Sequence, residues 1–411
     1  MRPNRWVLAC LLLVALFALG RPARAASLPP PPPAAASGPS ASAQAAGQPS
    51  PAELARQQLA SLDTTTIARF VDEAGQAVPN SGFSWASLGA FLHGKGVLTH
   101  PGRLFSALGD LFLGEVRGNL ALLARLLVLV VLSAVLRQLH GAFEGEAIGR
   151  VADAAIFLAL GLICLAGFRS AVGMARGAVQ NLGSFMLALL PALIGLLAAT
   201  GSVTSAGLIH PAVVAAVTAI GLLVQAVIVP LVVLAAVLDI VSAFSPEFRL
   251  TRLAGLLRQV GLGLLGLAST VFLGVVAVEG IAGSVADGLA LRTGKYAVRT
   301  LIPVVGGMLA DTAELVLTSG LLLRSGLGLV GLVATALLVV VPLLKLLALG
   351  LIYRGAAALA EPVGGEAVAA VLGGVGSAVV LLGAAVTVVG LMWFLSLAVL
   401  VGAGGAALTA R

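Results

Sequence analysis

The chain has 411 residues, of which 59% are hydrophobic and only 10% are charged, with a formal net charge of +7. Soluble globular domains have about 25% charged residues, so a chain this poor in charge cannot cover a surface in water. The composition excludes an ordinary soluble domain and predicts an all-α integral membrane bundle, because long apolar runs recur along the chain. The basic residues are dispersed over short polar stretches with few aromatics, which argues against nucleic-acid binding.

Residues 1–25 are organised like a secretory signal peptide. Arg2 and Arg5 precede an apolar stretch at 6–20, and the Ala-Arg-Ala sequence at 23–25 places small residues before a cleavage site. We expect cleavage after residue 25. An uncleaved anchor helix is the alternative, and in both cases the following segment is exported.

Two segments of different composition follow the signal peptide. Residues 26–50 are rich in Pro, Ala and Ser, include five consecutive prolines, and are predicted to form a disordered linker. Residues 51–117 are more polar and carry apolar residues at helical spacing, such as Ile67, Phe70 and Val71. This spacing predicts exported amphipathic helices that lie on the outer membrane surface or against a partner.

Residues 118–411 are predicted to form a transmembrane domain of about seven spans, with nine possible. Two spans are expected at 154–168 and 182–199, joined by a short loop that Arg169 and Arg176 bound. Three further spans are expected at residues 120–136, 260–278 and 327–344. The basic stretch before residue 260 is expected to lie at the membrane interface.

Two apolar segments are longer than the roughly 20 residues that one straight span needs. Residues 211–241 contain Pro230 and form either one long helix or two half-spans. Residues 371–403 form either one long helix or a tight hairpin around Gly390.

Small residues recur four positions apart within the predicted spans, a spacing that lets helix backbones approach closely in lipid. The pairs are Gly266 and Thr270, Gly280 and Ser284, Gly331 and Thr335, Gly373 and Ser377, and Gly383 and Thr387. They predict dense packing within the bundle or within a homo-oligomer.

The stretch VADGLALRTGKYAVRTLIPVVG at 285–306 concentrates charge in an otherwise apolar region. Its charged residues are Asp287, Arg292, Lys295 and Arg299. Pro303 and the pair Gly306 and Gly307 disfavour a regular helix, whereas Asp311 and Glu314 would share one helix face. A broken element that lines a cavity explains this pattern, and so does a loop with an amphipathic helix.

Ionisable residues at membrane depth are candidate functional residues. Asp239 and Glu279 lie close to span ends, so each is either a site residue, a group that reaches the headgroups, or half of a local pair. The two cysteines and four histidines form no disulfide or metal pattern, and no cofactor-binding or catalytic motif is present. The sequence therefore predicts no enzyme, metal site or cofactor.

Several stretches in series resemble the stage III sporulation protein AE family of endospore-forming bacteria. They are ADGLALRTGKYAVRTLIPVVGGMLAD, LPALIGLLAATGSVTSAGLIHPAVV, LIYRGAAALAEPVGG and GLMWFLSLAVLVGAGG. The resemblance covers roughly residues 100–411, and the stretches follow one another in the same order as in the family. Gly294 departs from the family pattern, in which a slightly larger small residue such as Ala is expected, and the long Pro/Ala segment is unlike that of typical members.

The resemblance implies a role in spore development after engulfment. It implies a multi-span subunit of a channel or secretion-like complex that joins mother cell and forespore, located in the mother-cell membrane. The implied partners are the other stage III sporulation A proteins, a forespore membrane partner and further copies of the chain. The alternative is an independent secondary transporter that uses Glu279, Asp311 or Glu314 as coupling carboxylates.

Overall fold

The computed structural model describes residues 64–78, 83–86, 101–140, 146–199, 203–244, 250–275, 306–364 and 366–409, all within one compact unit of residues 51–411. Within these ranges the regular structure is helical throughout, which confirms the all-α prediction. The helices are α3 (Thr65–Gln76), α5 (Pro101–Gly118), α6 (Leu120–His140), α7 (Glu146–Ala199), α8 (Val203–Leu222), η2 (Leu223–Ile228), α9 (Val229–Phe244), the helix Thr251–Val275, α11 (Gly306–Gly364) and α12 (Glu366–Thr409). The predicted signal peptide and linker lie outside the described residues.

Six helical segments of the described chain are long and apolar enough to cross a membrane. They are Ser106–Val135, Ala155–Leu196, Val213–Ser242, Thr251–Val275, Ser325–Val363 and Glu366–Val401. The membrane character of the chain is therefore confirmed. From Thr251 onward, the basic stretch expected at the interface forms the first part of the helix Thr251–Val275.

The loop predicted between residues 168 and 182 is wrong, because α7 runs through it as one helix of 54 residues. Arg169 and Arg176, which suggested the loop, are exposed on the side of this helix. No proline lies between them, so the backbone hydrogen bonds can continue. At 1.5 Å per residue, α7 is roughly 80 Å long. This length is well over twice the thickness of the hydrocarbon core of a bilayer, which is about 30 Å.

The two long apolar segments are each continuous. The segment around Pro230 follows α8, η2 and α9 without a break, so the half-span alternative is excluded. A proline ring presses on the carbonyl four residues earlier in a regular helix. The π-helical turn η2 ends at Ile228, two residues before Pro230, and at its end the Val229 N–H donates to the carbonyl of Val224. Helix α12 also runs through Gly390, which excludes the hairpin.

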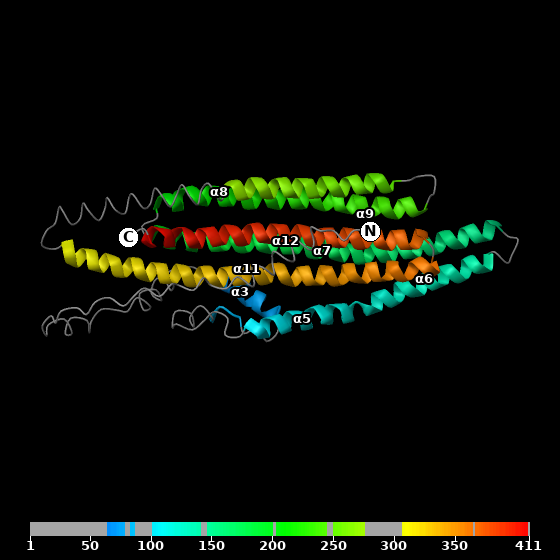
Figure 1. The fold of residues 1–411 in the computed structure, drawn as a ribbon, viewed down its shortest axis with the longest axis horizontal. Helices are drawn as coiled ribbons and strands as arrows, with labels where there is room; N and C mark the ends of the chain where they lie inside the picture. Colours follow the sequence, from blue (N-terminus) through cyan, green and yellow to red (C-terminus); the bar gives the residue numbers. More distant parts are fainter. Residues whose placement is uncertain are drawn as a thin grey trace. The chain divides into compact units, whose positions relative to one another are not determined.

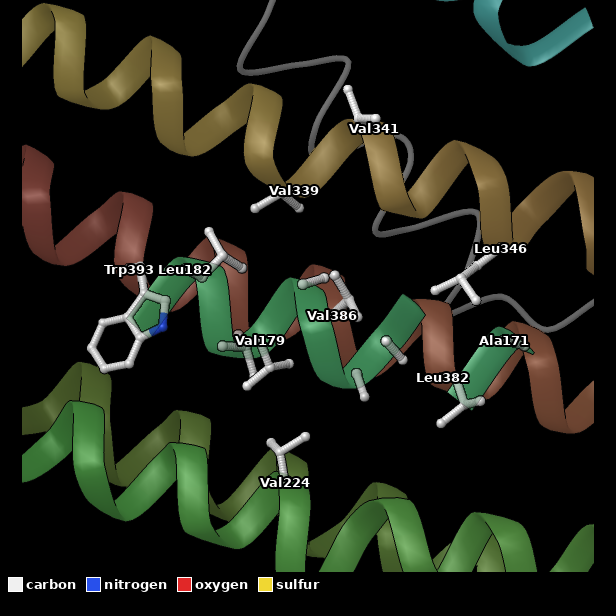
Figure 2. Close-up of a cluster of buried hydrophobic side chains, with 14 of the residues drawn as sticks. Ala171, Val179, Leu182, Val224, Val339, Val341, Leu346, Leu382, Val386 and Trp393 are labelled. Atoms are coloured by element: carbon white, nitrogen blue, oxygen red, sulfur yellow. The ribbon is translucent and has the colours of Figure 1, made fainter. Parts of the chain in front are cut away.

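The core of the unit lies where α12 packs along α11, α7 and α9 (Figure 1). Helices α11 and α12 are antiparallel, since Gly328 lies against Val401 whereas Gly350 lies against Val380. Figure 2 shows side chains of these helices meeting in this core, with Trp393 at one end of the cluster. The Trp393 ring also meets Phe272 edge to face at a centroid distance of 5.4 Å.

The small-residue pairs serve the packing unequally. A Cβ atom at Gly331 would lie 2.9 Å from Leu189 Cδ2, so the close approach predicted for this glycine is confirmed. Gly383 lies in ordinary contact with α11, whereas Gly266 faces open space. In each pair whose side chains are described, the Ser or Thr hydroxyl donates to the carbonyl of the glycine four residues earlier.

The predicted amphipathic helix near residue 67 is confirmed as α3, and its apolar face lies on the bundle itself. Ile67, Phe70 and Val71 are buried, and the Phe70 ring meets Phe185 of α7 edge to face at 5.8 Å. The Asp72 carboxylate accepts a hydrogen bond of 2.7 Å from the backbone N–H of Trp85, which ties the following turn to α3.

Candidate functional site

The candidate site is a largely buried ion pair between two consecutive helices. Asp239 lies near the end of α9, and Arg258 lies on the helix Thr251–Val275. Arg258 Nη2 donates one hydrogen bond to Asp239 Oδ2 and another, of 3.1 Å, to the main-chain carbonyl of Gly374 on α12. Exposure is 7% for the Asp239 side chain and 22% for that of Arg258. A single guanidinium group therefore connects three helices.

Gly374 makes room for this pair. A Cβ atom at position 374 would lie 2.7 Å from Asp239 Oδ2 and 3.0 Å from Asp239 Cβ. Any larger residue would therefore push the carboxylate and α9 away from α12. The Arg258 Nε–H is buried and donates to no atom of the described residues.

A charge in such surroundings is unfavourable alone and is tolerated when it is paired. The pair fixes the register of α9, the following helix and α12 relative to one another. The helix that carries Arg258 ends at Val275, and residues 276–305 lie outside the described residues. The described residues bring together no group of three metal-binding side chains.

Asp239, Arg258 and Gly374 all lie within residues 86–404, which match the family model of stage III sporulation protein AE. The chain belongs to this family. It is 35% identical to stage III sporulation protein AE of Bacillus subtilis (strain 168) over 356 residues, which are 86% of this chain and 88% of that protein. No solved structure matches the chain significantly. The resemblance stated from the sequence is therefore confirmed.

Several site residues were predicted for this stage III sporulation protein AE family member. Among them, Asp239 is the one whose side chain the structure describes. Its partner Arg258 was missed, because the sequence placed it in an interfacial basic stretch. A signal was available: Asp239 and Arg258 carry opposite charges on either side of the short connection at 245–249. Ser242 and Thr251 also share a hydrogen bond of 3.1 Å across this hairpin.

The other predicted site residues fall into two groups. Glu279, Asp287, Arg292, Lys295, Arg299 and Pro303 lie outside the described residues. Gly306, Gly307, Asp311 and Glu314 lie in the first turns of α11, which is regular from Gly306 onward. The helix break thus stays a prediction for the residues before Gly306. Helical backbone at 311 and 314 places these two positions on one side of α11.

A second polar contact of the family member joins α7 to α11. The Tyr353 hydroxyl donates a hydrogen bond of 3.1 Å to the carbonyl of Cys164, and both residues are buried. Gly167 lies one turn further along α7, where a Cβ atom would be 2.1 Å from Tyr353 Oη. The glycine therefore accommodates the hydroxyl.

Replacing Tyr353 by phenylalanine should lower the free energy of unfolding by about 1 kcal/mol, since the buried hydrogen bond to the Cys164 carbonyl is lost. Gly167→Ala should be more harmful, because the new methyl group meets the hydroxyl. In the Tyr353→Phe background the Gly167→Ala change should cost less, since the hydroxyl is gone. Thermal unfolding of the four proteins in detergent would measure this coupling, and strictly additive losses would contradict it.

Proposed function

We propose that this protein is the large multi-span subunit of a channel or secretion-like complex that joins mother cell and forespore after engulfment. The observation that carries the proposal is the family match over residues 86–404. The same proposal places the chain in the mother-cell membrane around the forespore, with its N-terminal segment outside the cytoplasm. Its role there is structural and in transport rather than enzymatic.

The helices α3 and α5 pack on the long helices, which supports a subunit whose N-terminal part and membrane bundle form one unit. Helix α3 buries its apolar face on α7, and Lys345 of α11 pairs with Glu115 of α5 at 3.3 Å. These contacts hold α3 and α5 against the long helices α7 and α11. We propose that this unit assembles with further copies of itself, with the other stage III sporulation A proteins and with a forespore membrane partner.

The charged stretch Asp287, Arg292, Lys295 and Arg299 is proposed as a polar ring or partner surface of the complex. Asp311 and Glu314 are proposed to face its interior. Arg292→Ala and Lys295→Ala variants test this assignment. Normal sporulation by both variants at normal protein level would contradict it.

Deletion of the gene in its own host tests the proposed function. We expect few heat-resistant spores and small, inactive forespores after engulfment, with recovery when the wild-type gene is restored. Heat-resistant spore counts and imaging of the forespore are the measurements. Normal spores in the deletion strain would contradict the proposal and favour the independent transporter.

A further inference from the structure

One side of α7 is polar in the middle of a helix that is otherwise apolar. Arg169, Gly173, Arg176, Gln180 and Ser184 follow one another at spacings of four and three, so they share one face. All five positions are exposed in the structure. We call this set the α7 polar face.

Apolar residues border the α7 polar face on both sides along the same helix. Leu158 and Leu162 precede it with 58% and 66% exposure, and Leu187 follows it with 42% exposure. Within the described residues no carboxylate lies within salt-bridge distance of Arg169 or Arg176. The face is therefore a positively charged band between two apolar surfaces.

The α7 polar face extends onto the next helix. Gln180 Nε2 donates a hydrogen bond of 3.2 Å to Oε1 of Gln225, which lies in the π-helical turn η2. Such turns occur frequently at functional sites. Two helices thus present amide groups beside the two guanidinium groups of Arg169 and Arg176.

A face with this chemistry is unfavourable against lipid chains, since unpaired polar and charged groups lose their hydration there. It needs either water or a polar partner. Gly173 and Gly177 leave open space beside the helix, with no atom within 4 Å of a built Cβ atom. A neighbouring helix can approach closely at such glycines.

We propose that the α7 polar face lines a water-filled passage for small anions, closed by the same face of neighbouring copies of this chain. Symmetric association of identical chains is the common form of oligomer, and it would set Arg169 and Arg176 in two positive rings. Arginine rings favour anions in pores. This inference rests on the proposed channel function and adds the lining residues and the class of solute.

Cysteine labelling of the full chain in membranes from sporulating cells tests this inference. Gln180→Cys and, as a second variant, Ser184→Cys should react with small membrane-impermeant thiosulfonates and resist a maleimide carried on a large polymer. The negatively charged thiosulfonate should react on the order of tenfold faster than the positively charged one, because a nearby fixed charge attracts one and repels the other. Adding Arg176→Gln to Gln180→Cys should reduce that preference.

Two controls fix the meaning of each outcome. Leu162 is also exposed on α7 but apolar, and Leu162→Cys should react with none of the impermeant reagents because that position faces lipid. The parent chain gives the background, since its Cys164 is buried. Labelling of the two polar-face cysteines by the polymer reagent would indicate an open aqueous surface, and labelling by no reagent would indicate a covered one. Either result, or a missing charge preference, overturns the inference.

The labelling test and the gene deletion can fail separately. Normal spores in the deletion strain would contradict the sporulation role and leave the labelling pattern readable. Unlabelled cysteines in a strain that depends on the gene would contradict the passage along α7 alone.

Discussion

Replacing Arg258 by alanine should lower the free energy of unfolding by about 3–5 kcal/mol, because the change leaves the buried Asp239 carboxylate without its partner. The same substitution removes the donor to the Gly374 carbonyl, so α12 also loses its polar contact with the hairpin. We expect a lower unfolding temperature in detergent and less folded protein in the membrane. The measurement is thermal unfolding of the purified full chain, compared with the wild type.

Arg252→Ala is the matched control, because Arg252 lies on the same helix and is exposed. Its effect should stay within about 0.5 kcal/mol, as for most surface substitutions. Asp239→Ala combined with Arg258→Ala should cost less than the two single changes added together, since the double variant leaves no buried charge alone. Equal effects of Arg258→Ala and Arg252→Ala, or additive single effects, would show that the pair does not hold the three helices.

The sequence predicted the helical membrane class and the apolar face of α3, because both follow from composition and helical spacing. It placed that face on the outer membrane surface or against a partner, whereas the face is buried on the bundle itself. It misplaced the boundaries of the long helices. Arg169 and Arg176 suggested a loop, although a helix can carry arginines on an exposed side without breaking its hydrogen bonds. Pro230 suggested two half-spans, whereas a π-helical turn before it keeps the helix continuous.

Of the candidate site, the sequence predicted Asp239 but neither Arg258 nor Gly374. Asp239 stood out as an ionisable residue in an apolar segment, and pairing with a neighbour was one of its possible roles. Identifying Arg258 required the hairpin geometry of α9 and the next helix. Gly374 is 116 residues from Arg258 in the chain, so its contact depends on tertiary packing that residue spacing does not encode.

Stability should also depend strongly on the close packing of α11 against α12. Within this contact, we expect a substitution of Gly390 to have the largest effect on the free energy of unfolding. A Cβ atom at Gly390 would lie 2.1 Å from Val339 Cγ2 and 2.8 Å from its Cγ1. The β-branched Val339 side chain is stiff at χ1 and is buried, so it has little freedom to turn away. Gly390→Val should therefore lower the free energy of unfolding by about 3 kcal/mol through overpacking.

Making Val339 smaller while residue 390 is larger tests whether the steric clash between them causes that loss of stability. Val339→Ala in the Gly390→Val background removes the two methyl groups that clash, so it should restore part of the lost unfolding temperature. Gly263→Val is the control, because no atom lies within 4 Å of a Cβ atom built at that exposed glycine of the helix Thr251–Val275. A loss at Gly263 equal to that at Gly390, or no recovery in the double variant, would mean that helix backbone effects rather than the α11–α12 contact set the stability.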